Sequence, residues 1–329
     1  MTSPTSPRPP LGLALPAGDR ARDEIAARLG INVPAQWWPT APMLKGFEAA
    51  GFRWVQVHTP PRGILCDPRH AARHAAALRA MLETCGLQLV LHGPDDLSAG
   101  TPEHDRALDG LLEYAASTRA RFVVYHGANF PIADGGRQAA VTRDRARAEE
   151  ASLHQRVGRL EALGLTLGVE NLAPVYPGPP RLCHSPAVVR GLVQRLDSPQ
   201  VRMLLDVGHA HITGSAREAL QSAAAEISLF HLHDNFGSSR PAIAAPALDP
   251  LRLDLHLAPG NGRVPWRQLA PLLVDHTAPL VLEVHPPNRP EPLSVAKVTT
   301  ELLAGRATRV DGSRSAVADD ARPSPVPLG

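Results

Sequence analysis

Short apolar runs alternate along this chain with longer amphipathic segments, and this alternation predicts its secondary structure. The apolar runs are dense in Val, Leu, Ile and Phe, which is typical of strands buried on both faces of a parallel sheet. They predict eight strands, at Leu29–Val33, Phe52–His58, Leu87–His92, Phe122–His126, Leu165–Glu170, Val201–Asp206, Ile227–His233 and Leu280–Glu283. The segments between them predict helices at Met43–Ala50, Ala71–Cys85, Pro102–Ser117, Arg137–Leu163, Pro186–Arg195, Ala216–Ala224, Val264–Leu273 and Leu293–Leu303.

Strands and helices that alternate over most of a chain favour an α/β fold, a closed (β/α)8 TIM barrel. An open doubly wound sheet is the alternative, but no Gly-x-Gly-x-x-Gly turn follows the first predicted strand. We expect one barrel domain over residues 26–305. The flanks, 1–25 and 306–329, are rich in Pro, Arg and Ser with little apolar periodicity, which predicts a flexible N-terminal segment and a disordered C-terminal tail. Within the first flank, Asp23–Leu29 is compatible with the start of a short helix.

Ionisable residues that can bind metals stand at or near the ends of the predicted strands from the third onward. They are His92, His126, Glu170, Asp206, His231 and Glu283. In a TIM barrel the carboxyl ends of the strands form the face that carries the active site. Acids and imidazoles that converge there after apolar strands are costly to bury unless they are paired or coordinate a cation. The sequence therefore predicts a divalent metal at the barrel mouth.

Three further candidate ligands lie in predicted connections. His209 follows Asp206 by three residues, and Asp254 and His256 lie in the long connection after the seventh strand. The candidate ligands are all nitrogen and oxygen donors, a set that suits Zn²⁺, Mn²⁺, Co²⁺ or Fe²⁺ better than Ca²⁺.

Four short motifs, each on its expected strand or loop, resemble those of a known family. They are Val-Glu-Asn at Val169–Asn171, Leu-Asp-Val-Gly-His-Ala at Leu205–Ala210, His-Leu-His-Asp at His231–Asp234, and the run from Asp254 to Gly262. With these motifs the chain, from about Leu29 to Leu303, resembles the xylose-isomerase-like TIM barrels. That superfamily includes sugar and sugar-phosphate isomerases and epimerases, inosose-processing enzymes and endonuclease IV (AP endonuclease family 2).

The isomerase branch of this resemblance implies one catalytic metal. Its ligands would be Glu170, Asp206, His231 and Glu283. Glu170 and Glu283 would act as the catalytic pair, exchanging a proton with the carbon next to a carbonyl, while the metal stabilises the enediolate oxygens.

The endonuclease IV branch implies three Zn²⁺ ions and phosphodiester hydrolysis. The first ion would be held by His92, His126 and Glu170. Glu170 would bridge to a second ion held by Asp206, His231 and Glu283. His209, Asp254 and His256 would hold the third. A bridging hydroxide would attack phosphorus.

The composition separates these two branches. The chain has 34 Lys and Arg against 32 Asp and Glu, a formal net charge of +2, and only 4% aromatic residues. Lysine is limited to Lys45 and Lys297, and Asp95 lies where endonuclease IV has an aromatic wedge after its strand-three histidine. A nucleic-acid partner is therefore disfavoured, because such a partner calls for phosphate-binding cations and a base-stacking side chain. We expect first a sugar or polyol isomerase or epimerase, second a three-metal phosphodiester hydrolase, and third a barrel that binds a metal and a sugar without turnover.

The remaining expectations concern the environment of the site. Asn171, His211, His233 and Asp234 are the candidate substrate-binding residues. The cofactor is expected to be one to three divalent ions, Zn²⁺ or Mn²⁺, and the substrate a small sugar-like molecule. No apolar run reaches the roughly 18 residues of a membrane span, and the three cysteines form no Cys-x-x-Cys pair, so a cytoplasmic protein is expected. Pairing into a homo-oligomer through proline-rich loops is left open.

Overall fold

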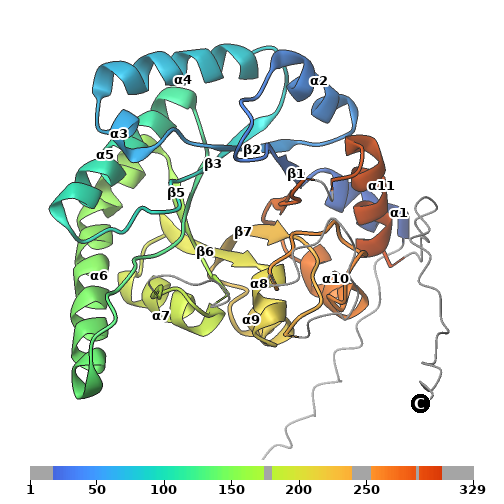
Figure 1. Ribbon diagram of the computed structural model, residues 1–329. Coiled ribbons are helices and arrows are strands. Elements are labelled where there is room, and N and C mark those ends of the chain that lie inside the picture. The colour runs from blue at the N-terminus through green and yellow to red at the C-terminus, as the bar shows by residue number, and fades with distance from the viewer. Residues whose placement is uncertain (1–17, 174–179, 239–252, 287–288, 306–329) are drawn as a thin grey trace, which may run out of the picture.

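Eight parallel strands close into a barrel in this computed structural model, and each strand pairs with its neighbours in chain order (Figure 1). The structure describes residues 18–173, 180–238, 253–286 and 289–305. The strands are β1 (Leu29–Asn32), β2 (Trp54–His58), β3 (Gln88–His92), β4 (Phe122–Tyr125), β5 (Thr166–Glu170), β6 (Val201–Asp206), β7 (Ile227–Leu232) and β8 (Leu280–Leu282). β1 also pairs with β8, which closes the ring and confirms the predicted (β/α)8 fold.

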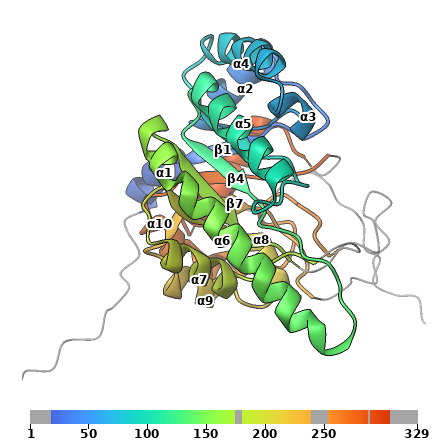
Figure 2. The same ribbon diagram turned by 90° about the vertical axis from the view of Figure 1, so that its left-hand side faces the viewer.

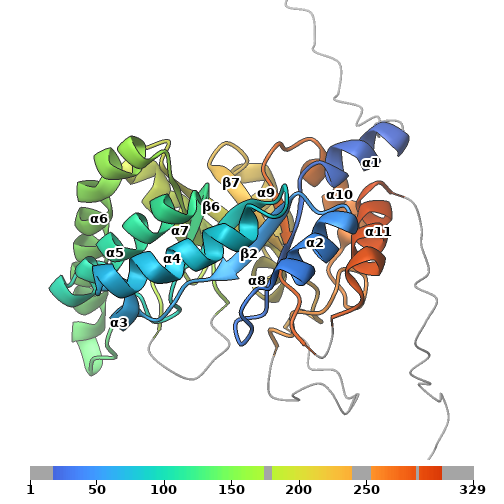
Figure 3. The same ribbon diagram turned by 90° about the horizontal axis from the view of Figure 1, so that it is seen from above.

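Helices surround the barrel on its outer side (Figures 1 and 2). They are α1 (Gly18–Ala26), α2 (Ala41–Ala49), α3 (Arg62–Leu65), α4 (Pro68–Leu82), α5 (Pro102–Thr118), α6 (Gln138–Leu163), α7 (Pro186–Leu196), α8 (Val207–Ile212), α9 (Ala216–Ser222), α10 (Trp266–Val274), α11 (Pro292–Leu303) and the 3₁₀ turn η1 (Gly135–Arg137). α2, α4 and α5 lie side by side along one flank (Figure 3). Among the described residues, no helix is both long and apolar enough to cross a bilayer.

Several helices begin where the sequence provides a cap. The side chains of Thr40, Asp67 and Ser185 accept hydrogen bonds from backbone N–H groups in the first turns of α2, α4 and α7. Each of these helices also has Pro in its first turn, where its missing N–H and fixed φ cost nothing. The caps therefore fix where these helices start.

The barrel interior is filled by a small apolar cluster that lies below the mouth. Its buried members are Trp54, Val90, Val124, Leu204, Leu229 and Val281. Gly30 leaves room for the large indole, because a Cβ at this position would lie 2.7 Å from the Cβ of Trp54. Since side chains alternate along a strand, the residues two positions further along each strand point inward one layer higher, at the mouth.

The boundaries of the elements differ from the predicted ones by one to three residues at most ends. β4, β7 and β8 end one residue before His126, His233 and Glu283, so these side chains project from the starts of loops. Assignments at the ends of elements commonly shift by a residue or two, because the last ladder hydrogen bonds decide them.

Three helices differ more substantially from the prediction. α1 starts at Gly18, inside the segment predicted to be flexible, and it is ordered by burial of Ala21 and Ile25 beside α11. α3 and α8 were not predicted. α8 follows β6 without a connection, and the Asp206 side chain caps it by accepting a hydrogen bond from the His209 N–H at 2.6 Å. The C-terminal tail and the first 17 residues lie outside the described residues.

Candidate metal centre

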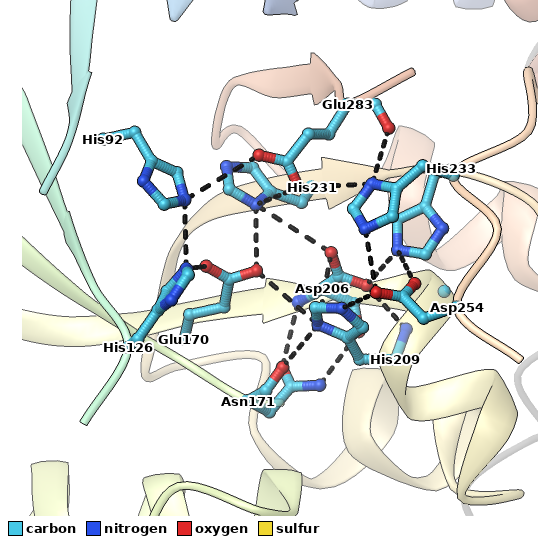
Figure 4. A network of polar contacts seen from close by, with 12 residues as sticks. His92, His126, Glu170, Asn171, Asp206, His209, His231, His233, Asp254 and Glu283 are labelled. Carbon is cyan, nitrogen blue, oxygen red and sulfur yellow. Dashed lines mark hydrogen bonds and ion pairs between the residues drawn. The ribbon is translucent and has the colours of Figure 1, made fainter. Parts of the chain in front are cut away.

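A ring of polar side chains forms the layer above the apolar barrel interior, one from each strand or from the residue that follows it, and Figure 4 shows the members from His92 onward. In strand order they are Asn32, Gln56, His92, His126, Glu170, Asp206, His231 and Glu283. All are buried except His126, which is partly exposed. Side chains on one face of a strand recur at every second residue, and each of these residues lies two positions beyond the apolar layer. The predicted ligands therefore meet at the mouth.

The central group of this ring consists of four residues whose ligand atoms all lie within 4.8 Å of one another. They are Glu170, Asp206, His231 and Glu283. The Nδ1 atom of His231 lies 3.1 Å from Glu170 Oε1, 3.5 Å from Glu283 Oε2 and 3.9 Å from Asp206 Oδ2. Ligands about 2.1 Å from one tetrahedral ion lie about 3.4 Å apart, so this spacing suits a shared cation.

A second group shares Glu170 with the first. His126 Nε2 lies 3.0 Å from His92 Nε2 and 3.1 Å from Glu170 Oε2, the carboxylate oxygen that does not face His231. His92 Nδ1 lies 2.9 Å from the Gly93 carbonyl, which requires a hydrogen on Nδ1 and leaves the lone pair on Nε2. Glu170 therefore directs one oxygen to each of two adjacent ligand groups (Figure 4).

A third group lies on the other side of the centre. It contains His209, Asp254 and His256, as the sequence predicts, together with His233. Asp254 Oδ2 lies 3.2 Å from His209 Nε2 and 3.0 Å from His256 Nε2. The Nδ1 atoms of these two histidines donate to the carbonyls of Asn171 and Glu283, both at 2.9 Å.

The backbone at His256 holds this arrangement under strain. His256 has φ of +47°, a left-handed conformation that is uncommon for a residue other than Gly. Its backbone carbonyl accepts a hydrogen bond from the His285 N–H at 3.1 Å, which ties the loop to the chain after β8. Such strain is characteristic of functional sites, where the surroundings fix a conformation that the residue disfavours.

All nine predicted ligands fall into these three groups, but the predicted substrate contacts do not face an open site. Asn171, His233 and Asp234 are at most 1% exposed. Asn171 bonds through its side chain to the backbone of Asp206, and His233 Nε2 lies 3.0 Å from Asp206 Oδ1. Asn171 and His233 are therefore engaged with Asp206, and contact of these residues with a substrate stays a prediction.

The side chain of Asp234 is also fully engaged within the protein. Its carboxylate accepts hydrogen bonds from the backbone N–H groups of Gly260 and Val264 and from Trp266 Nε1, at 2.9 to 3.0 Å. It therefore holds the connection between β7 and α10, which carries Asp254 and His256. His211, the fourth predicted substrate contact, is half-buried beside Gly237.

Asn32 and Gln56 of the ring were missed by sequence reasoning, and the role of His58 was left open. Gln56 Nε2 donates to Glu283 Oε1 and Gln56 Oε1 lies beside His231 Nε2, both at 2.7 Å. His58, at the end of β2, forms a further possible ligand group with His92 and Asp95. The inward parity of Trp54, Gln56 and His58 was the available signal, but a neutral amide gives no sign of metal chemistry in a sequence.

Buried charges give the centre its chemical character. Burial by itself raises the pKa of Glu170, but His231 and His126 outweigh it and hold that pKa well below its usual range. Burial lowers the pKa of His231, yet Glu283 and Glu170 raise it to about 9. The Glu170 carboxylate therefore carries negative charge although it is buried.

The donors fit a divalent metal. In the described part of the chain, Glu170, Asp206 and Glu283 form ion pairs with histidines and none with Arg or Lys. Asp206 Oδ2 is buried and accepts no hydrogen bond from the described residues. Buried carboxylate oxygens in this state require a cation, and oxygen with imidazole nitrogen is the donor set of Zn²⁺ and Mn²⁺ sites.

Solved structures with the same fold cover most of this chain. A D-tagatose 3-epimerase-like protein has a TM-score of 0.63 and 18% identity, over 84% of this chain and 97% of its own. A xylose isomerase domain protein from Alicyclobacillus acidocaldarius has a TM-score of 0.60 and 23% identity, over 84% and 98%. The IolI protein, solved with a bound zinc atom, has a TM-score of 0.61 and 17% identity, also over 84% and 98%.

Comparison of the sequence with protein families shows the family to which the chain belongs. No curated protein matches the chain significantly. The family model of the xylose isomerase-like TIM barrel matches residues 45–303, which include every strand after β1 and all the ligand groups described above. The chain therefore belongs to the xylose isomerase-like TIM barrel family.

Proposed function

We propose that this protein is a divalent-metal-dependent isomerase or epimerase of a sugar, sugar phosphate or polyol. The observation that carries the proposal is the pair Glu170 and Glu283, which approach His231 Nδ1 from two different strands of the ring, at 3.1 and 3.5 Å. Two ionised carboxylates beside one cation site are suited to removing a proton from a carbon and returning it from another direction. Several solved structures of the same fold are titled as sugar epimerases, which supports this choice.

Each residue of the central group has a distinct task in this proposal. A Zn²⁺ or Mn²⁺ ion held by Glu170, Asp206, His231 and Glu283 would polarise the substrate carbonyl and stabilise negative charge on its oxygen. Glu170 and Glu283 exchange the proton at the neighbouring carbon. Gln56 holds Glu283 and His231 in place, so that the proton-transfer geometry is fixed before the substrate arrives.

Isotope exchange tests this proposal directly. Incubating the metal-loaded protein in ²H₂O with a panel of ketoses and ketose phosphates should incorporate deuterium at the carbon next to the carbonyl. Glu170→Gln and Glu283→Gln should each reduce exchange by about 10²-fold or more, the usual contribution of a general base. Glu226→Gln serves as the control, because Glu226 lies at the opposite end of the barrel, immediately before β7, where it bonds to Gln194.

The metal content must be followed in the same variants. A variant that loses exchange while it retains metal supports proton transfer by its carboxylate. Exchange that survives in both variants would exclude the proposed chemistry.

A second candidate function, a three-metal phosphodiester hydrolase, is favoured by one specific observation. The three ligand groups are contiguous, since Glu170 joins the first to the second and Asp206 lies 3.5 Å from His209 of the third. Three ions per chain in protein purified without chelators, with cleavage of a diester to a phosphomonoester and an alcohol or nicking of an abasic duplex, would establish this function. One ion per chain with no diester cleavage would leave the isomerase.

A further inference from the structure

Arg289 lies beside the ring of polar residues, in the connection from β8 to α11. Its Nη1 donates to Asn32 Oδ1 at 3.3 Å, and the same oxygen accepts a hydrogen bond from the Val284 N–H, also at 3.3 Å. Asn32 is the β1 member of the ring, and Val284 directly follows Glu283. One amide side chain therefore connects the guanidinium to the backbone next to a predicted catalytic carboxylate.

No carboxylate contacts this guanidinium in the described part of the chain. Arg62 and Arg156, in contrast, each contact two carboxylates. Arg289 Nη2 is buried and makes no hydrogen bond to the described part of the chain. The guanidinium carbon lies 5.3 Å from the centre of the Phe47 ring, a cation–π contact that gives Nη2 no hydrogen-bond acceptor.

The surroundings of Arg289 are consistent with a missing anion. Burial lowers the pKa of Arg289 to about 10, with no neighbouring acid to oppose the shift. A partly desolvated cation of this kind is costly unless an anion joins it. A guanidinium offers two parallel N–H donors, which match the oxygens of a phosphate or a carboxylate better than any neutral group.

We propose that Arg289, oriented by Asn32, is the anion-binding subsite of this protein and binds a phosphate or carboxylate group of the substrate. This inference deepens the proposed function, on which it rests, because it selects sugar phosphates and sugar acids over neutral sugars. The anion would lie on the β1–β8 side of the mouth, and the reacting carbon beside Glu170 and Glu283.

Binding of simple anions to the purified, metal-containing protein tests the proposal without any turnover. Inorganic phosphate and acetate are titrated separately by calorimetry into the wild type, Arg289→Gln, Arg289→Lys and the control Arg263→Gln. Arg263 is a matched control because its guanidinium also lies near an aromatic ring, 6.0 Å from that of Phe236. We expect phosphate, acetate or both to bind at least tenfold more weakly to Arg289→Gln, intermediate affinity for Arg289→Lys, and wild-type affinity for Arg263→Gln.

The comparison of the two anions identifies the natural group, since the tighter one indicates a phosphate or a carboxylate on the substrate. Metal content is also measured in each variant. Where it is equal, anions that bind directly to the metal contribute equally to every titration, and a difference in affinity reports on Arg289. Unchanged affinity for both anions in Arg289→Gln would overturn the proposal. If isotope exchange fails in every ketose while the Arg289-dependent anion binding remains, the isomerase chemistry is wrong and the subsite stands.

A measurement on the unaltered protein covers the case in which Arg289→Gln does not fold. Phenylglyoxal modifies accessible guanidinium groups, and peptide mapping gives the rate at each arginine. Phosphate or acetate should slow modification of Arg289 several-fold and leave Arg263 unaffected. Equal rates at Arg289 with and without both anions would contradict the assignment.

Discussion

Gln56 determines which nitrogen of His231 is available to a metal. Because Gln56 Nε2 donates to Glu283 Oε1, its carbonyl oxygen is left to accept from His231 Nε2 at 2.7 Å. His231 Nε2 then carries a hydrogen in both protonation states, so a metal that displaces the second proton would bind at Nδ1, which faces the carboxylates. Groups that orient a ligand in this way tune metal affinity although they do not touch the ion.

Replacing Gln56 by Leu should therefore weaken metal binding at the central group by about 10- to 100-fold, because both hydrogen bonds are lost at nearly constant volume. Competition with a chromophoric chelator measures the change. Gln194→Leu is the control, since Gln194 bonds to Glu226 and not to the site. Equal affinities in the two variants would show that Gln56 has no orienting role.

The sequence predicted which residues stand at the strand ends and face the mouth, but it did not predict the contacts that each side chain makes. His92, Glu170 and Asp206 could be placed at the mouth because strand parity and barrel topology decide which way they point. The contact of His233 with Asp206 could not be predicted, because His233 follows the end of β7 at Leu232 and strand parity no longer fixes its partners. The pairing of Asn32 with Arg289 joins residues 257 positions apart, and no local pattern carries that information.

At the scale of elements, α6 anchors the loops that follow β3 and β4. Arg145 on α6 donates to the carbonyls of Ser98 and Asn129 at 2.8 and 3.0 Å. One turn later, Glu149 Oε1 accepts hydrogen bonds from Tyr125 Oη and the Ala128 N–H, at 2.7 and 2.6 Å. The helix could be predicted from its length and composition, but these anchoring contacts depend on its rotation against the barrel.

Glu149 gives this anchor a predictable pH dependence. Burial raises the pKa of the Glu149 carboxyl above its ordinary 4.5, so the native state holds this proton more tightly than the unfolded chain. The resulting stabilisation is fully present below pH 4.5 and is lost as the pH rises through the raised pKa.

Urea unfolding between pH 4 and 7 should therefore show the wild type losing stability relative to Glu149→Gln, by about 1.4 kcal/mol for each unit by which the pKa is raised. Glu113→Gln changes an exposed acid on α5 and should run parallel to the wild type. A constant difference between the wild type and Glu149→Gln across this range would contradict the prediction.

At the scale of the whole molecule, the ligand groups join elements that are far apart in the sequence. Their members come from the carboxyl ends of β3 to β8, from α8 and from the connection after β7. An ion that binds this arrangement has few partners in the unfolded chain, so its binding free energy adds to the stability of the fold. Saturation at 100 times the dissociation constant contributes about 2.7 kcal/mol.

Removing the metal with a chelator should accordingly lower Tm by about 4 °C in a protein of this size, and adding Zn²⁺ or Mn²⁺ should restore it. Scanning calorimetry measures the shift. Asp206→Asn loses a central ligand, so its Tm should respond much less to the chelator. Identical melting curves for the wild type with and without chelator would argue that no resident ion supports the fold.

Glu170 has a consequence for how such a centre fills. One of its oxygens faces His231 and the other His126, so an ion in either position immobilises the carboxylate that its neighbour also needs. Under the three-metal alternative, the ordering of this side chain would be completed once for two binding events, a coupling that opposes the mutual repulsion of the two ions. A metal titration of the chelated protein would then show whether the second ion binds more tightly than the first.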